Sequence, residues 1–204
     1  MIAEHIFYSG ALAILVGMVF YKLTGRDSSW IIILCAWAPD VFGIIIPLLN
    51  HAGVTLFSMW YYILNPVLHT VAAMVIFGFI MAYLLRMSGL RFADTFFFSI
   101  IGYGSHLVED ALVYKSGYMY LWPYSWERLG TSLLPNVFST ENYIIDFFYI
   151  ADTGVLTIGI AFFLVAIAIR TWYEGRSWIR FYMPDTMYVT LFGKTSTFQD
   201  RIPP

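Results

Sequence analysis

The sequence predicts an all-α integral membrane protein, a helical bundle with about five transmembrane helices. Of its 204 residues, 60% are hydrophobic and only 12% are charged, which is too little polar surface for a soluble domain of this length. The apolar residues form continuous runs close to the ~20 residues that cross a bilayer as a helix. The runs lack the alternating pattern of transmembrane β-strands, so we expect helices.

Five segments have the length and composition of membrane spans. The first lacks the basic start and the cleavage site of a signal peptide, and we expect it to be retained as a helix. The second contains "WAPDVFG", and the third begins within "LNPVLHT". The fourth ends in "SHLVEDALV", and the fifth comes after a long aromatic stretch. The predicted spans cover residues 5–22, 30–49, 66–85, 92–113 and 143–169.

The basic residues predict how this bundle is oriented. Nine of the eleven Lys and Arg residues fall between spans 1 and 2, between spans 3 and 4, or after span 5, and only Lys115 and Arg128 fall on the other side. The positive-inside rule then places the N-terminus outside and the C-terminus inside, in a multi-pass protein of the cell membrane. Residues 1–170 are predicted to form the transmembrane domain, and residues 171–204, where basic and aromatic residues mix, an interfacial tail at the inner face.

Composition also excludes several classes of protein. The single cysteine, Cys35, excludes an internal disulfide and a Cys-rich metal site. The net charge is −2 and there is no basic stripe, so nucleic acid is not an expected partner. The connection at 114–142 is long for a helical bundle, which predicts either a lid over a site or a loop resting on lipid headgroups.

Eight ionisable residues within the spans share one depth, in the outer half of the predicted membrane. A charged side chain at mid-bilayer costs about 2.5–3.5 kcal/mol or more, so each of these groups needs a partner or a function. Solitary histidines that bond neighbouring helices would not be expected to agree in depth. The set is His5, Asp40, His69, His106, Glu109, Asp110, Asp146 and Asp152.

His106 and Asp110 are four residues apart, so they share one face of a helix and could bind one metal ion together. Asp40 could join them, because the preceding proline can kink span 2 and turn the carboxylate into the bundle. Contributions from His5 and His69 would complete a ligand set of imidazole and carboxylate groups, which suits Zn, Mn, Fe or Ni.

The other polar residues allow more than one role. Glu109 could be a general base, an i+3 partner of His106, or an interfacial carboxylate. Asp146 and Asp152 could be metal ligands, acceptors for a ligand imidazole, or partners of Arg128. His51 is predicted to be a surface histidine.

These motifs resemble the YdjM-like family of membrane-bound metal-dependent hydrolases. The likeness covers about residues 1–125 and ends in "SHLVEDALVYKSGYMYLWPYS", where Ser105, His106, Asp110, Gly117, Trp122 and Pro123 follow the family pattern. The resemblance implies a metal site formed by His5, Asp40, His69, His106 and Asp110. The stretch "NPVLHT" departs from the pattern, because many relatives have a basic residue a few positions before the histidine.

We therefore expect a divalent metal, with Zn favoured over Mn or Fe, that lowers the pKa of bound water to about 7 for attack on an ester. Asp40 or Glu109 could be the general base. A site below the outer headgroups suits a lipid or lipid-linked substrate, with a phosphoester favoured. The sequence leaves two alternatives open: an ion or proton transporter that uses the same residues, and an accessory subunit of a membrane complex or homo-oligomer.

Overall fold

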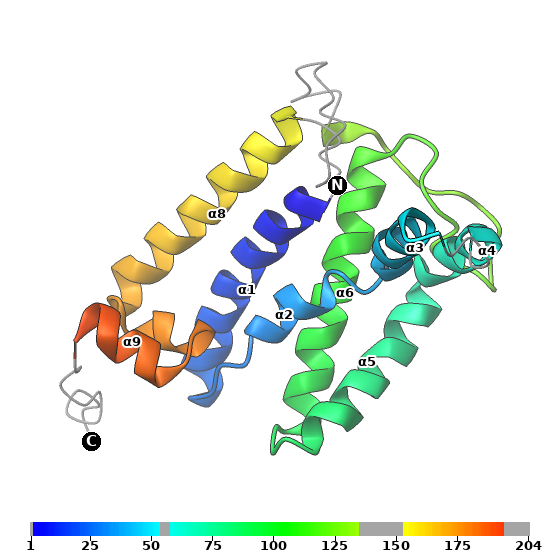
Figure 1. The fold of residues 1–204 in the computed structure, drawn as a ribbon. Helices are drawn as coiled ribbons and strands as arrows, with labels where there is room; N and C mark the ends of the chain where they lie inside the picture. Colours follow the sequence, from blue (N-terminus) through cyan, green and yellow to red (C-terminus); the bar gives the residue numbers. More distant parts are fainter. Residues whose placement is uncertain (1, 54–57, 135–152, 194–204) are drawn as a thin grey trace.

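A computed structural model of the protein describes residues 2–53, 58–134 and 153–193, and within these ranges the fold is helical. The described part of the chain contains no β-strand, and its β-structure is limited to an isolated bridge between Tyr118 and Leu129. The helices in chain order are α1 (Ile2–Thr24), α2 (Trp30–Cys35), α3 (Val41–His51), α4 (Ser58–Leu68), α5 (Val71–Arg86), α6 (Phe92–Val113), α8 (Thr153–Glu174), the 3-10 helix η1 (Ser177–Tyr182) and α9 (Asp185–Phe192) (Figure 1).

The long helices lie side by side in the order α8, α1, α6 and α5 (Figure 1). Helices α1, α5 and α8 run in one direction and α6 runs in the other. The short helix α2 packs against both α1 and α6, and α3 packs against α4 beyond α6. The first turn of α1 and the last turns of α6 therefore lie at the same end of the bundle.

The lengths of the helices support part of the predicted set of spans. Helix α6 has the predicted bounds, and α1 contains the predicted first span. Helix α8 extends five residues beyond the predicted end at 169, and residues 143–152 of the fifth span lie outside the described ranges. By length and composition, two described helices could cross a membrane, Ala3–Thr24 and Gly154–Glu174, while Val71–Arg86 is apolar but shorter.

The predicted span over residues 30–49, in which a kink was expected at Pro39, is divided into two helices. Helix α2 ends at Cys35 and α3 begins at Val41. Pro39 has no N–H to donate and disfavours a helical conformation in the residue before it. The chain instead forms tight turns, in which the N–H groups of Ala38 and Asp40 donate to carbonyls three residues back at 3.2 Å. The Asp40 side chain is thereby carried by a turn rather than by a helix.

The third predicted span also begins later than expected, at Val71 instead of residue 66. Thr70 has an extended backbone, and its hydroxyl accepts a hydrogen bond of 3.1 Å from the N–H of Ala73, as an N-cap residue does. A separate helix, α4, ends just before it. His69 consequently lies at the junction of two helices.

Helices α2 and α6 are in backbone contact. A Cβ atom on Gly102 would lie only 2.3 Å from the carbonyl oxygen of Ile32, so no other residue fits there without movement. Small residues permit this close approach between membrane helices. Around the contact, Ile31, Cys35 and Phe98 form a core with no exposed surface. The contact fixes the end of α2 beside the middle of α6.

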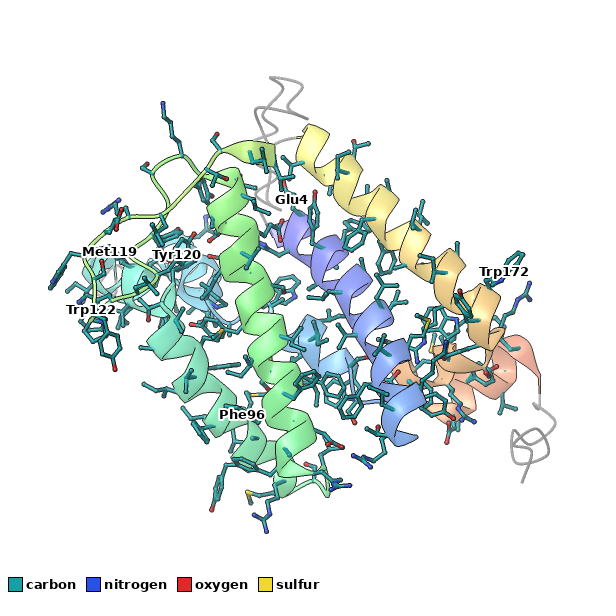
Figure 2. The ribbon with its side chains drawn as sticks, turned by 180° about the vertical axis from the view of Figure 1, so that it is seen from behind. Glu4, Phe96, Met119, Tyr120, Trp122 and Trp172 are labelled. Atoms are coloured by element: carbon teal, nitrogen blue, oxygen red, sulfur yellow. The ribbon has the colours of Figure 1, made fainter. Side chains whose placement is uncertain are left out.

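Large apolar side chains cover the outward faces of α5 and α8. Ile76 and Phe79 on α5 are 61% and 52% exposed, and Leu164 on α8 is 58% exposed. Trp172, which is 86% exposed, points away from the bundle (Figure 2). So many exposed large apolar side chains are unusual on a soluble monomer and are typical of helices that face lipid.

The C-terminal segment begins as part of the bundle. Helix α8 continues to Glu174, past the predicted domain boundary at residue 170. Trp178 in η1 is buried and packs with Ile14 of α1 and Ala166 of α8. That residues beyond this point lie at a membrane interface stays a prediction.

Candidate metal centre

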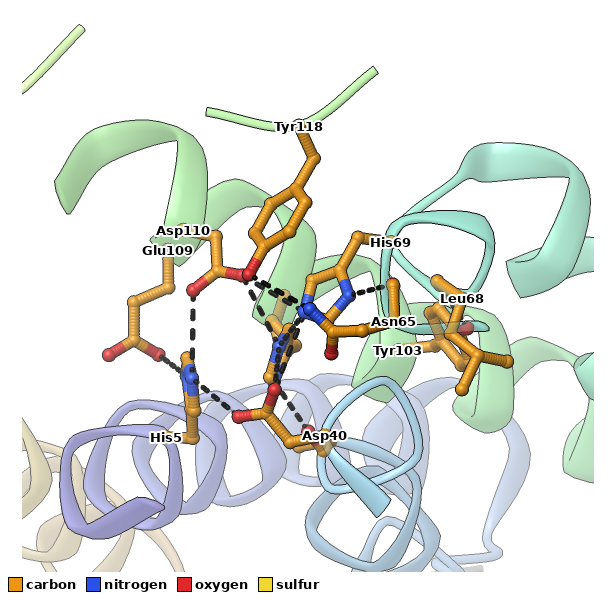
Figure 3. Close-up of polar contacts among 12 residues, drawn as sticks. His5, Asp40, Asn65, Leu68, His69, Tyr103, Glu109, Asp110 and Tyr118 are labelled. Carbon is orange, nitrogen blue, oxygen red and sulfur yellow. Dashed lines mark hydrogen bonds and ion pairs between the residues drawn. The ribbon is translucent and has the colours of Figure 1, made fainter. Parts of the chain in front are cut away.

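The five predicted ligands converge at one point, although four separate parts of the chain carry them (Figure 3). His5 lies in the first turn of α1, and Asp40 lies in the turn between α2 and α3. His69 lies between α4 and α5, and His106 and Asp110 lie one turn apart on α6. We call these five residues the His/Asp cluster.

The nitrogen and oxygen atoms at the centre are spaced like the ligands of one ion. His69 Nε2 lies 3.4 Å from Asp40 Oδ1 and 3.3 Å from Asp110 Oδ2. His106 Nε2 lies 3.4 Å from Asp110 Oδ2 and 3.3 Å from His69 Nε2. His5 Nε2 is 3.7 Å from each carboxylate. Ligands about 2.0–2.2 Å from a tetrahedral zinc ion are about 3.3–3.6 Å apart, so small movements would suffice to bind one.

The other nitrogen of each imidazole ring contacts a hydrogen-bond acceptor outside the centre. Nδ1 of His69 lies 2.7 Å from the carbonyl oxygen of Asn65, and Nδ1 of His106 lies 2.8 Å from that of Ala36. Nδ1 of His5 lies 2.7 Å from Oε2 of Glu109. Because carbonyls and carboxylates only accept, each Nδ1 must carry the proton, which leaves Nε2 of the neutral ring as an acceptor.

With the three rings neutral, the five cluster residues themselves supply acceptors and no donor at the centre. Three Nε2 lone pairs and two carboxylates face one another, and His5 Nε2 and Asp110 Oδ1 are buried without a hydrogen-bond partner. Buried acceptors in this number are unfavourable unless a positive charge joins them. A metal cation that prefers nitrogen and oxygen ligands would supply this charge, so the five residues fit a bound metal ion.

Glu109 lies on the side of His5 that faces away from the centre of the cluster. Its Oε2 is the acceptor for His5 Nδ1, and the side chain is nearly buried. A carboxylate in this position fixes the tautomer and the orientation of a ligand imidazole. The Ala36 carbonyl does the same for His106, and it is available because α2 ends before it.

The cluster is open mainly at Asp40. The side chain of Asp40 is 28% exposed, whereas the other four are at most 4% exposed. The open edge lies at the turn between α2 and α3. A substrate or solvent molecule would therefore approach the centre past Asp40.

Two residues that the sequence analysis did not single out belong to the site. The ring of Tyr118 stacks on that of His69, with centroids 3.9 Å apart and an interplanar angle of 19°. The side-chain amide of Asn65 donates to the Tyr118 hydroxyl at 3.5 Å, and the Asn65 carbonyl orients His69. No local signal identifies either residue, because any residue four positions before His69 offers the same backbone carbonyl and Tyr118 has several neighbouring tyrosines.

The loop that carries Tyr118 packs against the cluster. The hydroxyl of Tyr103 on α6 donates to the carbonyl of Leu68, which holds the end of α4 against α6. Tyr120 is buried, and its pKa is raised by burial and then by the charge of Asp110, so this phenol stays neutral. Met119 and Trp122 lie at the outer edge of the same loop (Figure 2).

The remaining predicted residues lie elsewhere. His51 is exposed at the end of α3, as expected for a surface histidine. Asp146 and Asp152 fall outside the described residues.

The fold and the site together define a helical membrane protein with a buried group of His and Asp residues that could hold a metal ion. The chain belongs to the family of YdjM inner membrane proteins, whose family model matches residues 1–178. This match confirms the resemblance found in the sequence and extends it through α8. No curated protein and no solved structure matches the chain.

Proposed function

We propose that this protein is a membrane-embedded, metal-dependent hydrolase that acts on a lipid or lipid-linked ester, with a phosphoester favoured. The main support is the geometry of the His/Asp cluster. Its ligand atoms are spaced 3.3–3.9 Å apart, and all three Nδ1 atoms bond acceptors outside the centre. A cluster held in this way from several helices is preorganised for one ion.

Within this proposal, Nε2 of His5, His69 and His106 and the carboxylate of Asp110 hold a divalent cation, with Zn favoured over Mn or Fe. When bound, the cation would supply Lewis-acid activation of water and of an ester oxygen. Asp40, at the open edge, serves as a fifth ligand or as the base that removes a proton from the attacking water.

Glu109, the other residue predicted as a base, already accepts a hydrogen bond from His5. That contact favours an orienting role for Glu109 and leaves Asp40 as the stronger candidate for proton transfer. In the hydrolysis, water adds to phosphorus, the bond from phosphorus to the alcohol oxygen breaks, and the alcohol leaves with the proton taken from water.

The membrane arrangement is also part of the proposal. We infer five crossings, formed by α1, by α2 with α3, by α5, by α6 and by the segment that ends in α8. Basic residues stand where α1 and α5 end and where α6 begins, at one end of the bundle in Figure 1, which supports an N-outside, C-inside orientation. The cluster then lies in the outer half of the bilayer, within reach of lipid headgroups.

Metal analysis of the purified protein tests the proposal. We expect about one equivalent of a transition metal in the wild type, and little in His106→Ala. His51→Ala is the matched control, because His51 is exposed and lies at the end of α3 that is farther from Asp40. Less than about half an equivalent of metal, unchanged by His106→Ala, would contradict metal binding.

Catalysis has a separate test with lipid phosphoesters in mixed micelles. The double variant His69→Ala, Asp110→Ala should have no metal-dependent activity, and full activity in this variant would exclude the proposed site. Metal-dependent ion flux in liposomes without product formation would favour a transporter. Copurification with other membrane subunits at fixed stoichiometry, without activity, would favour an accessory subunit.

A further inference from the structure

The chain that follows α6 is held firmly over the His/Asp cluster. The N–H of Leu129 donates to the carbonyl of Tyr118 at 3.1 Å, and the N–H of Val71, the first residue of α5, donates to the carbonyl of Tyr120 at 2.8 Å. Gly117 has a φ of +34°, and a Cβ atom there would lie 1.5 Å from the carbonyl oxygen of Leu129. These contacts fix the backbone on both sides of Tyr118.

From this backbone, the side chain of Tyr118 reaches into the site. Its ring lies flat on His69, and its hydroxyl points toward Asp110 and the centre of the cluster (Figure 3). Asn65, which is 8% exposed, places its amide 3.5 Å from that hydroxyl. Two uncharged groups that can donate hydrogen bonds therefore stand together beside the centre.

Basic side chains do not neutralise the site. Among the described residues, Asp40, Glu109 and Asp110 make their close contacts with histidines, and none forms an ion pair with lysine or arginine. Lys115 and Arg128, which belong to the loop above the cluster, are both exposed. One divalent cation among three carboxylates leaves the site with a net negative charge.

We propose that Tyr118 is a substrate-binding residue that donates a hydrogen bond to a non-bridging oxygen of a phosphodiester, and that the site binds singly charged phosphodiesters in preference to doubly charged phosphate monoesters. This inference rests on the proposed metal-dependent function. A second negative charge on the substrate would meet the net negative charge of the site without a lysine or arginine to offset it. Tyr118 and Asn65 stabilise substrate oxygens through neutral donors, which suits a group that carries one charge.

The test uses the full chain in detergent, loaded with cobalt(II), whose visible spectrum reports ligands at the metal. The probes are dibutyl phosphate and monobutyl phosphate at about pH 8, where a monoester has lost its second proton. We expect dibutyl phosphate to change the spectrum and to bind at least about tenfold more tightly than monobutyl phosphate. Tyr118→Phe should bind the same amount of cobalt but bind dibutyl phosphate about tenfold more weakly, as expected for one lost hydrogen bond to a charged group.

Two further variants make the result specific. Tyr124→Phe is the matched control, because Tyr124 lies on the same loop and is 93% exposed, and it should bind dibutyl phosphate like the wild type. Asn65→Leu removes the second donor but keeps the backbone carbonyl that orients His69, so it should also retain cobalt and bind dibutyl phosphate more weakly.

The outcomes separate this inference from the function on which it rests. Unchanged dibutyl phosphate affinity in Tyr118→Phe, or equal affinities of the wild type for the two phosphates, would overturn the inference while the metal site stands. Loss of cobalt from Tyr118→Phe would show that the hydroxyl supports the metal ligands, and would also overturn it. A wild type that takes up no cobalt would refute the metal-dependent function itself.

Discussion

Two buried polar clusters stand at opposite ends of this bundle, and they differ in charge balance. The His/Asp cluster gathers three imidazoles and two carboxylates, with no lysine or arginine among its five residues. The second, which we call the Arg170 cluster, contains its own cation. Arg170 has no exposed surface and pairs with Asp27 at 2.6 Å and with Glu174 at 3.0 Å. Its other members are Ser29 and Tyr182.

The Arg170 cluster joins parts of the chain rather than forming a site. Arg170, on α8, also donates from Nη1 to the carbonyl of Ile14 on α1 at 3.2 Å and to the hydroxyl of Tyr182 in η1 at 3.4 Å. Asp27 accepts from the N–H of Ser29, at the start of α2. Burial of charge is therefore not by itself a sign of function, whereas a set of acceptors with no cation among its own side chains could hold a metal ion.

The largest expected effect is a loss of stability on substitution in the Arg170 cluster. Arg170→Ala would leave the carboxylate of Asp27 buried without its partner, which typically costs about 3–5 kcal/mol of stability. We expect a large drop in the thermal unfolding midpoint in detergent, with metal content per folded molecule unchanged. Arg176→Ala is the control, since Arg176 is exposed. Equal midpoints for Arg170→Ala and the control would mean that the Arg170 cluster does not stabilise the bundle.

A variant of the His/Asp cluster should lose metal affinity without losing stability. Asp110→Asn removes one ligand charge, so we expect metal affinity to fall at least about a hundredfold, more than the loss of an outer partner usually costs. Without metal, its unfolding midpoint should equal or exceed that of the metal-free wild type, because the new amide adds donors among acceptors. Asp185→Asn, at an exposed aspartate, should change neither property. A lower metal-free midpoint in Asp110→Asn would mean that the carboxylate is structural.

Removal of metal should lower the stability of the protein only through the His/Asp cluster. An ion present at about a hundred times its Kd stabilises the folded protein by about 2.7 kcal/mol, so EDTA should lower the unfolding midpoint of the wild type. The same treatment should leave Asp110→Asn unaffected, since that variant holds little metal. An equal response of the two proteins to EDTA would place the effect outside the His/Asp cluster.

The smallest of these effects concerns the partner of His5. Glu109→Ala should weaken metal binding about 10–100-fold, because the imidazole loses the acceptor that fixes its tautomer. Glu109→Gln should weaken it less, since an amide oxygen can still accept from Nδ1. Titration of the metal-free protein measures both affinities, with the exposed Glu127→Ala as control. Wild-type affinity in Glu109→Ala would remove its orienting role.

Much of the His/Asp cluster could be predicted from the sequence, because side chains that share a face and a depth follow from helical periodicity. His106 and Asp110 on α6 are the clearest example. The convergence of His5 and Asp40 could be expected only from their common depth. Their contact depends on which helices are neighbours, and local sequence does not specify that.

Features that depend on turns or on distant contacts were not predictable. The break between α2 and α3 goes beyond the kink expected at Pro39, because the apolar pattern continues across it. Arg170 was expected among the basic residues beyond the fifth span, but it is buried because Asp27, far away in sequence, pairs with it. Tyr118 reaches the cluster through a loop whose course depends on contacts with α5 and Leu129.

The contact at Gly102 has a consequence for genetic screens. Gly102 leaves no room for a methyl group beside Ile32 of α2. One helical turn later on α6, His106 contacts the Ala36 carbonyl at the end of the same helix α2. An alanine at Gly102 would push that helix outward and move the carbonyl away from the imidazole. A search for loss-of-function alleles should therefore recover Gly102 alongside the ligands, even though it contributes no functional group of its own.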